Sequence, residues 1–274
     1  MKKHFNIAIC QLKVIDNKES NINRALEMIK KASKNADLII LPEMFNCPYD
    51  NSKFKEYAEE RENSETLNAI SEASKENNVY VVAGSIPELE NDEIYNSSFI
   101  FDNKGEIIDY YRKMHLFDID TPTIKFKESD TISAGNRIGI FDTPFTKIGI
   151  AICYDMRFPE LLRIMALKGV NLIIVPGAFN MTTGPAHWEL LVRGRSVDNQ
   201  VFMAAASPAR NEELSYVAYG NSMITDPWGN ILARASENEE IIYADINLDN
   251  INRVRRELTV LKNRRDDIYS LIEK

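Results

Sequence analysis

The sequence is poor in the residues that build disulfide scaffolds and metal centres. Its 274 residues include three cysteines and three histidines, with no Cys-x-x-Cys pair and no two histidines at metal-ligand spacing. No apolar run approaches the ~20 residues needed to span a bilayer. The first residues hold two lysines and only a short apolar run, which disfavours a signal peptide. We therefore expect a cytoplasmic protein that uses no metal and no other cofactor.

Positive charge is also scarce. Lysine and arginine together number 33 against 41 aspartates and glutamates, which gives a formal net charge of −8. Because nucleic acids and anionic membranes would repel such a chain, neither is expected as a partner. A hydrophobic share of 44% is enough for a large core. With no linker in the sequence, we expect one α/β domain over residues 1–274, with its core at about 5–247.

The apolar periodicity indicates strands that alternate with helices. Strands are predicted at 5–12, 37–41, 79–83, 95–101, 106–111, 148–152, 171–175, 201–206, 222–225, 231–234 and 240–246. Helices are predicted at 20–34, 64–77, 159–168 and 186–197, and from about 248. Residues 45–61 form a polar, aromatic segment, and 112–137 are mostly loop. This order predicts sheets that are covered by helices on their outer faces.

Cys153 ends one of the predicted strands, in KIGIAICYDMRFPE. Pro159 stands where a helix could begin, since a proline in the first turn loses no needed N–H group. A cysteine on such a strand-to-helix turn lies near the positive end of a helix dipole, which would lower its pKa and help to bind an oxyanion. The structural alternative is a buried core cysteine.

Two more polar residues follow apolar strands, and with Cys153 they could form a nucleophilic site. Glu43 follows DLIILP, and Lys113 follows IIDYYR. Alone, Glu43 could be a cap or a solvated charge, and Lys113 an exposed strand end. A free thiol has a pKa of about 8.5 and needs a base or a positive neighbour. A carboxylate can take its proton, and a lysine can stabilise the oxygen that becomes negative in a tetrahedral intermediate.

The stretches LPEMF, YRKMHLFD and GIAICYDMRFPE resemble the three signatures of the nitrilase, or carbon–nitrogen hydrolase, superfamily. The resemblance implies a four-layer αββα sandwich that dimerises through its outer helices, with 248–274 at the subunit interface. It also implies that Glu43 is the general base, Lys113 the transition-state cation and Cys153 the nucleophile. Glu128, in FKESD, matches a second glutamate that holds the lysine and the substrate, although it could be one loop charge among several.

Within the superfamily, the chain is most similar to the omega-amidases. The similar stretches are LPEMFNCPYD, YRKMHLFDID, PGAFNMTTGPAHWELL and RSVDNQVFMAAASPAR. The resemblance implies hydrolysis of the terminal amide of 2-oxoglutaramate and 2-oxosuccinamate to the 2-oxo acid and ammonia, through a cysteine thioester. Two departures are Thr123-Ile124, where glycine and lysine are expected, and Cys47, where the usual residue is small and polar. The alternatives are a deaminated-glutathione amidase, an N-carbamoyl amino-acid hydrolase and a non-catalytic binding protein.

A small oxo-acid substrate carries a carboxylate, so the pocket of this acidic protein needs a local cation. Arg157 is the candidate, because a matching arginine in related N-carbamoyl amino-acid hydrolases binds the substrate carboxylate. A structural salt bridge is the alternative role for Arg157. The backbone N–H of Tyr154 is a candidate oxyanion donor. Tyr49, Thr182 and Thr183 could donate hydrogen bonds to the substrate from neighbouring loops.

Overall fold

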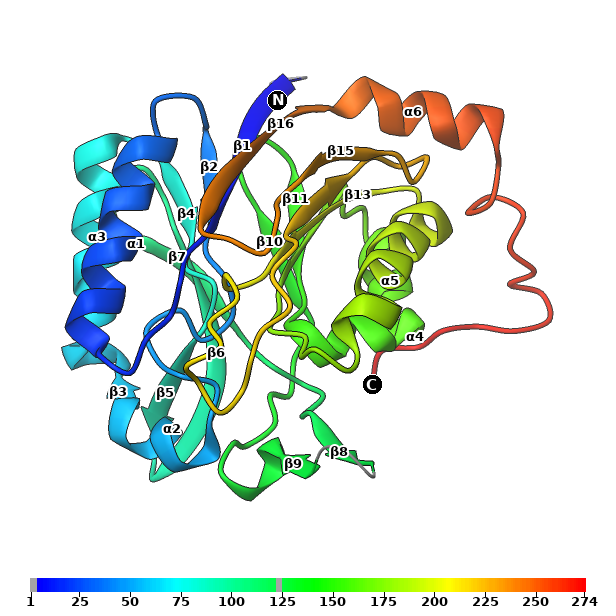
Figure 1. The fold of residues 1–274 in the computed structure, drawn as a ribbon. Helices are drawn as coiled ribbons and strands as arrows, with labels where there is room; N and C mark the ends of the chain where they lie inside the picture. Colours follow the sequence, from blue (N-terminus) through cyan, green and yellow to red (C-terminus); the bar gives the residue numbers. More distant parts are fainter. Residues whose placement is uncertain (1–3, 122–124) are drawn as a thin grey trace.

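Two β-sheets pack face to face in the computed structural model, which describes residues 4–121 and 125–274 (Figure 1). Within these residues the larger sheet has eight strands, with β7 paired to β6 beside the main order. That order is β16 (Glu240–Asn247), β1 (His4–Gln11), β2 (Leu38–Ile40), β4 (Tyr80–Val82), β6 (Glu93–Phe101), β5 (Ile86–Glu90) and β3 (Glu59–Glu60), and β7 is Ile107–Arg112.

The smaller sheet has six strands in the described residues, and a separate two-stranded ribbon stands apart from it. Its order is β10 (Gly139–Asp142), β11 (Lys147–Ile150), β12 (Leu172–Pro176), β13 (Phe202–Ala206), β14 (Met223–Thr225) and β15 (Ile231–Arg234). The ribbon pairs β8 (Asp118–Asp120) with β9 (Lys125–Lys127).

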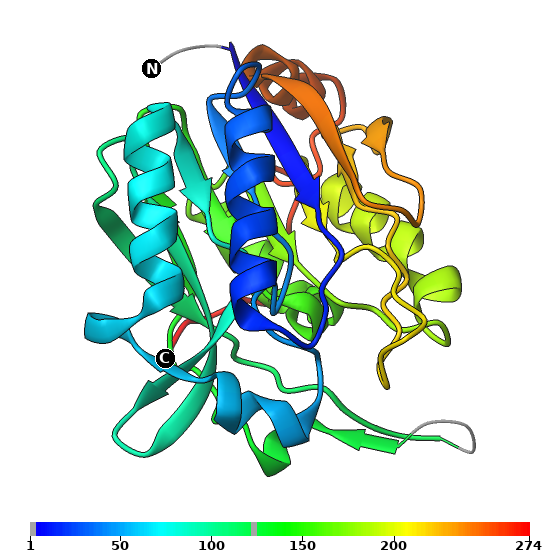
Figure 2. The ribbon, with the colours of Figure 1, turned by 60° about the vertical axis from the view of Figure 1, so that its left-hand side comes forward.

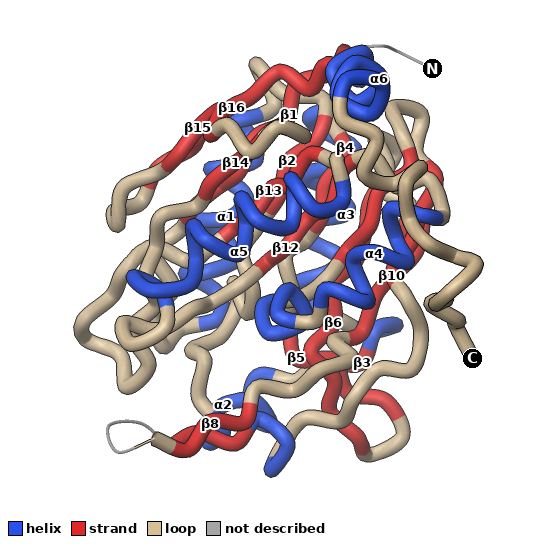
Figure 3. The backbone as a smooth tube through the Cα atoms, turned by 90° about the vertical axis from the view of Figure 1, so that its right-hand side faces the viewer, coloured by secondary structure: helices blue, strands red, loops and turns tan. Residues whose placement is uncertain are grey.

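Helices cover the outer face of each sheet. The larger sheet is covered by α1 (Lys18–Ala32) and α3 (Glu65–Asn77), which lie side by side (Figure 2). The smaller sheet is covered by α4 (Pro159–Leu167) and α5 (Gly184–Asn199) (Figure 3). The remaining helices are α2 (Asn51–Tyr57), α6 (Leu248–Glu257) and the 3-10 helices η1 (Arg61–Asn63), η2 (Glu128–Asp130) and η3 (Cys153–Arg157). The expected αββα order of layers is confirmed.

Strand β1 shows why the sheets are buried on both faces. Its side chains alternate between two cores, as the period of a strand requires. Phe5, Ile7 and Ile9 pack into the core between the two sheets. Ala8 and Cys10 pack into the core beneath the helices α1 and α3. From Ile7 onward, every residue of β1 is buried, and the strand has no solvent-facing side there.

Some short elements were not predicted. Helix α2 lies in the segment that was described only as polar and aromatic, and the ribbon β8–β9 lies in the predicted loop. Strand β5 has the sequence IPELE, which contains a proline and is too short to show a clear alternation of apolar and polar residues. The residues after β5 form a turn that lets it pair with β6. Asn91 and Asp92 both take left-handed conformations there (φ 52° and 65°). Two such residues suit the tight turn that joins β5 to β6.

The chain ends in an extended segment that passes α4 (Figures 1 and 3). Lys168, at the end of α4, forms an ion pair with Glu273. No helix among the described residues combines the length and the apolar character that crossing a bilayer requires.

Candidate active site

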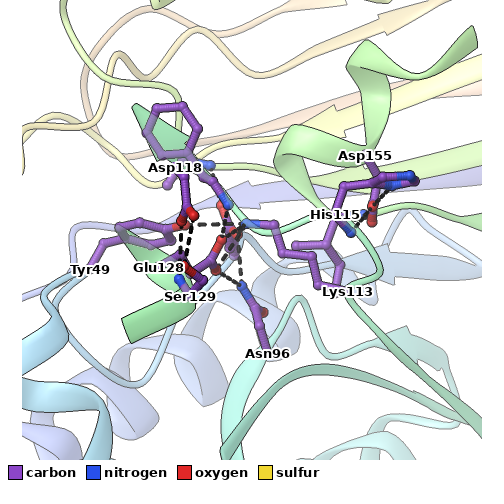
Figure 4. A network of polar contacts seen from close by, with 12 residues as sticks. Tyr49, Asn96, Lys113, His115, Asp118, Glu128, Ser129 and Asp155 are labelled. Atoms are coloured by element: carbon purple, nitrogen blue, oxygen red, sulfur yellow. Dashed lines mark hydrogen bonds and ion pairs between the residues drawn. The ribbon is translucent and has the colours of Figure 1, made fainter. Parts of the chain in front are cut away.

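Glu43, Lys113 and Glu128 come from three separate segments and meet in the interior. All three side chains are fully buried. Lys113 Nζ lies 2.9 Å from Glu43 Oε1 and 2.8 Å from Glu128 Oε2. The Tyr49 hydroxyl accepts a further hydrogen bond from Lys113 Nζ, at 3.2 Å (Figure 4). The structure thus brings together both glutamates and the lysine that the sequence singled out, and it places Tyr49 beside them.

Glu43 is fixed by a close approach between two loops. Ser85 accepts a hydrogen bond from Met44 N at its Oγ (3.1 Å) and donates its own N–H to Pro42 O (3.2 Å). Gly84 makes this approach possible, because a Cβ there would lie 1.9 Å from Pro42 O. Its φ of +41° also favours glycine. The end of β2 is therefore held rigidly, and Glu43 projects from it into the site.

Asn96 joins the cluster from β6, although nothing in the sequence singled it out. Its Nδ2 donates to Glu43 Oε1 at 2.9 Å and to Glu128 Oε1 at 3.1 Å. The backbone carbonyl of Asn96 accepts a hydrogen bond from the backbone N–H of Lys113, at 2.9 Å. The other carboxylate oxygens accept backbone N–H groups, Glu43 from Ala178 (2.7 Å) and Glu128 from Phe117 (2.6 Å). Each carboxylate is thus oriented by several donors.

Cys153 stands at a strained turn. Its backbone is left-handed (φ 48°), which for a non-glycine residue costs on the order of 1–3 kcal/mol. Cys153 is the first residue of η3, which precedes α4, so the cysteine begins a short 3-10 helix and not α4 itself. Gly177 packs directly against it, since a Cβ at residue 177 would lie 3.3 Å from the Cys153 Cα. The cysteine residue is 4% exposed.

The electrostatics of the thiol differ from the sequence-based expectation. Burial raises the pKa of Cys153 well above its ordinary value, and the Glu43 carboxylate, which shares a hydrogen bond with the thiol, raises it further. Lys113 opposes this but does not reverse it. The expectation that the helix dipole lowers the pKa of Cys153 is therefore wrong, because burial and a neighbouring anion outweigh one helical turn.

The same cluster controls the other protons. Burial raises the pKa of Glu43, Lys113 opposes the rise, and Glu128 adds to it. Burial alone would lower the pKa of Lys113, but Glu128 and Glu43 raise it above its usual value. The lysine is consequently a permanent cation. The thiol and Glu43 both have raised proton affinity, which suits proton transfer between them.

A second polar group ties the two catalytic segments together. Asp155 is fully buried and accepts hydrogen bonds from the Tyr111 hydroxyl (2.8 Å), the backbone N–H of Ile152 (2.9 Å) and His115. His115 contributes both its backbone N–H (2.9 Å) and Nδ1 (2.7 Å), and its ring stacks on Phe158. Figure 4 shows this pair on the opposite side of Lys113 from Glu128. Asp155 therefore joins the strand that leads to Lys113 to the turn that carries Cys153.

Arg157 packs against two aromatic rings and a histidine. Its guanidinium lies 4.9 Å from the centre of the Phe179 ring and 5.7 Å from that of Tyr154. Nη1 lies 3.3 Å from His187 Nδ1. Among the described residues Arg157 forms no ion pair with a carboxylate, so the structural salt bridge considered as its alternative role is not observed.

The two threonines that precede α5 differ in exposure. Thr183 is buried, and its hydroxyl donates to Asn180 Oδ1 at 3.1 Å. Thr182 is exposed, and only its backbone N–H reaches the same oxygen, at 3.0 Å. The Thr123-Ile124 pair, which departs from the omega-amidase pattern, lies outside the described residues.

Aromatic rings separate the cluster from an outer hollow of about 640 Å³. The rings of Tyr49 and Tyr216 lie 4.7 Å apart, and Phe126 of the ribbon packs against both. The two tyrosines also line a smaller hollow that contains Glu43 and Cys47. Cys47 donates to the carbonyl of its neighbour, and burial raises its pKa.

Comparison with solved structures identifies the fold as that of the nitrilase superfamily. Saccharomyces cerevisiae Nit3, a member of branch 10 of that superfamily, superposes with a TM-score of 0.89 and 42% identity over 97% of this chain and 99% of that chain. The NitFhit protein of C. elegans superposes with a TM-score of 0.90 and 31% identity, over 98% of this chain and 66% of that chain.

Sequence comparison assigns the family. The family described as carbon–nitrogen hydrolase matches residues 6–256, and the chain belongs to it. Nitrilase homolog 2 of Dictyostelium discoideum is 51% identical over 98% of this chain and 83% of its own length. An omega-amidase of Danio rerio is 48% identical over 97% of both chains.

Proposed function

We propose that the protein is an omega-amidase that hydrolyses the terminal amide of 2-oxoglutaramate and 2-oxosuccinamate to the 2-oxo acid and ammonia. The buried cluster of Glu43, Lys113 and Glu128 beside Cys153 carries this proposal. The 48% identity to the omega-amidase of Danio rerio, over 97% of both chains, supports the choice of substrate class.

In the first half of the reaction, Cys153 Sγ attacks the amide carbonyl carbon while Glu43 takes the thiol proton. Because burial raises the proton affinity of both groups, the thiolate forms as the bond forms and not in the resting enzyme. The tetrahedral intermediate then breaks its carbon–nitrogen bond. Glu43 gives its proton to the departing nitrogen, which leaves as ammonia, and a thioester remains on Cys153.

In the second half, water replaces ammonia. Glu43 accepts a proton from the water as its oxygen attacks the thioester carbon. The second tetrahedral intermediate breaks its carbon–sulfur bond, and Glu43 returns the proton to the sulfur. Glu128 lies beside Lys113 and orients it.

The oxyanion of both intermediates needs fixed donors. Lys113, which remains charged throughout, and the backbone N–H of Tyr154 serve this role in the proposed mechanism. Loss of one such donor typically costs about 3 kcal/mol of transition-state stabilisation.

The substrate carboxylate is assigned to Arg157. The Arg157 guanidinium is held over Phe179 and has no carboxylate partner in the part of the chain that the structure describes, so it can receive a bidentate anion. Tyr49 and Thr182 are proposed to donate hydrogen bonds to the rest of the substrate. Thr183 would join them only if its hydroxyl exchanged the hydrogen bond to Asn180 Oδ1 for one to the substrate. Of these, Tyr49 has the strongest support, because its hydroxyl lies 3.2 Å from Lys113 Nζ.

The protein is further proposed to act in the cytoplasm as a homodimer or higher homo-oligomer. Large apolar side chains are exposed on α5, where Leu190 is 68% exposed, and in the turn between β14 and β15, where Trp228 is 50% exposed. The C-terminal segment also exposes Ile268 (68%) and Ile272 (76%). Surfaces of this kind mark protein contacts. Sedimentation of the full chain tests this, and a monomer at micromolar concentration would contradict it.

Ammonia release by the purified protein tests the activity. The substrates to compare are 2-oxoglutaramate, an N-carbamoyl amino acid and a nitrile, which all liberate ammonia, and deaminated glutathione, whose hydrolysis is followed by the cysteinylglycine that it liberates. Cys153→Ala is the control for each. We expect rapid release from 2-oxoglutaramate that the control lacks. Release from another substrate alone would contradict the substrate assignment, and equal release by the control would contradict the mechanism.

A further inference from the structure

We propose that Asn96 is a positioning residue that holds Glu43 and Glu128 together around Lys113 and keeps Glu43 available as a base. This role rests on the proposed function, in which Glu43 moves the protons. Asn96 itself does not contact the reacting atoms in the proposed mechanism, so its effect is exerted through the two carboxylates.

The geometry gives one amide group two acceptors. Asn96 Nδ2 lies 2.9 Å from Glu43 Oε1 and 3.1 Å from Glu128 Oε1, and an amide nitrogen carries two hydrogens. The residue is fully buried on β6, and its backbone carbonyl accepts a hydrogen bond from the backbone N–H of Lys113. One residue therefore fixes the relative positions of all three charged side chains.

The orientation of the amide follows from the charges. Were it reversed, Oδ1 would face two carboxylate oxygens and repel both. In the orientation that bonds them, Oδ1 has no hydrogen-bond partner within residues 4–121 and 125–274. A buried oxygen left in this way is a cost to folding, so fold stability alone gives no reason for asparagine at this position.

The charges around Glu43 show why a shared donor matters. Two carboxylates and one ammonium leave the cluster with an excess of negative charge, which favours protonation of a carboxyl group. A neutral donor shared by both carboxylates opposes that protonation without adding a second cation. The titratable and charged groups that face Glu43 from its surroundings are Lys113 after β7, Glu128 of η2, Cys153 of η3, and the loop residues Tyr49 and Tyr216.

The neighbouring residue offers a matched control. Ser97 is equally buried on the same strand, but it points to the other face and donates to Glu88 at 2.5 Å. Ser97→Ala therefore removes a buried hydrogen bond to a glutamate from β6 without touching Glu43 or Glu128.

The test is the pH dependence of kcat/KM for wild type, Asn96→Leu and Ser97→Ala. Leucine has a similar size and no donor. We expect the acid limb of the Asn96→Leu profile to move to higher pH by roughly one unit, the size of effect that a charge-assisted hydrogen bond has on a carboxyl group. Ser97→Ala should keep the wild-type limb. An unchanged limb in folded Asn96→Leu, with only a uniform loss of rate or a lower melting temperature, would overturn the proposal.

Two additions keep the result decisive. If Asn96→Leu does not fold, Asn96→Thr retains one hydroxyl donor on a residue suited to strands. It should show a smaller shift of the acid limb in the same direction, and no shift would overturn the proposal.

The rate at which iodoacetamide alkylates Cys153, followed by mass spectrometry against pH, should show the same shift. This second readout needs no amide turnover, so it still decides the role of Asn96 if the wild type hydrolyses none of the proposed substrates.

Discussion

Arg112 and Lys113 are consecutive residues at the end of β7, yet they serve two glutamate clusters of opposite character. Arg112 Nε donates to Glu88 at 2.8 Å, and Glu88 also accepts from Arg61 Nε (3.0 Å) and Ser97. In this group, the Glu88 cluster, Arg112 and Arg61 surround the one buried carboxylate, Glu88, and both also pair with the more exposed Glu90. Burial opposes ionisation, but Arg112, Ser97 and Arg61 together lower the pKa of Glu88.

The Glu43 cluster has fewer cations than carboxylates. One cation, Lys113, stands between Glu43 and Glu128, and the pKa of Glu43 is raised. A buried carboxylate that pairs with two cations, as Glu88 does, is held in its charged form and supports structure. One that is undercompensated retains affinity for a proton and can exchange it, which is the property that a general base needs.

The largest effect should come from the two groups that exchange the proton. Cys153→Ala and Glu43→Gln should each lower kcat at least ~10⁴-fold, because the first removes the nucleophile and the second cannot carry a proton. Ammonia release measures the loss, and circular dichroism checks that the fold is kept. Residual activity near the wild-type level in either variant would contradict the proton-exchange role.

The two neighbouring cations give the sharpest contrast. Lys113→Met should lower kcat by about 10²- to 10³-fold, since it removes an oxyanion donor. Arg112→Met should leave kcat within a few-fold of wild type and lower the free energy of unfolding by about 3 kcal/mol, because Glu88 loses a buried partner. Kinetics and urea denaturation of both variants provide the comparison. A large loss of kcat in folded Arg112→Met would erase the distinction between the clusters.

The clusters should also separate on titration with acid. The lowered pKa of Glu88 stabilises the fold above the ordinary glutamate value of 4.5, and that contribution is lost as pH falls through the lower folded pKa. The raised pKa of Glu43 has the opposite sign: its contribution to stability is present below 4.5 and is lost as pH rises through the folded pKa.

Activity should therefore fall at a higher pH than stability does. Since Glu43 must be ionised to accept a proton, kcat/KM should decline below a pH that lies above 4.5, while the melting temperature is still near its maximum. Parallel profiles of kcat/KM and melting temperature check this. Coincident loss of both would argue against separate titrations.

The smallest effect is expected at Tyr111, which precedes both cations on β7. Tyr111→Phe removes one hydrogen bond to Asp155 and leaves the backbone and His115 donors in place. The free energy of unfolding should fall by about 1 kcal/mol, and kcat by less than tenfold. Denaturation and steady-state kinetics measure both; a loss of kcat as large as that of Lys113→Met would place Asp155 in the Glu43 cluster.

Local sequence patterns predicted most of the scaffold and the strand ends that carry Glu43, Lys113 and Cys153. These features depend on periodicity and on residues close in the chain. Asn96 and Asp155 were missed because their partners are 32–53 and 3–44 residues away, and an asparagine in a strand or an aspartate after a cysteine has no local pattern that reveals such contacts. The sign of the shift in the pKa of Cys153 required knowledge of burial, which the sequence does not contain.

The left-handed backbone at Cys153 implies a conflict between durability and activity at one position. Glycine is the residue best suited to a φ of 48°, so Cys153→Gly should relieve a tension that Cys153→Ala retains. Against that gain stands the greater freedom that glycine gives the unfolded chain. If the backbone strain dominates, Cys153→Gly will have a higher melting temperature than the wild-type enzyme. Residue 153 would then be a place where the polypeptide is kept less robust than it could be, in order to present sulfur at a fixed angle.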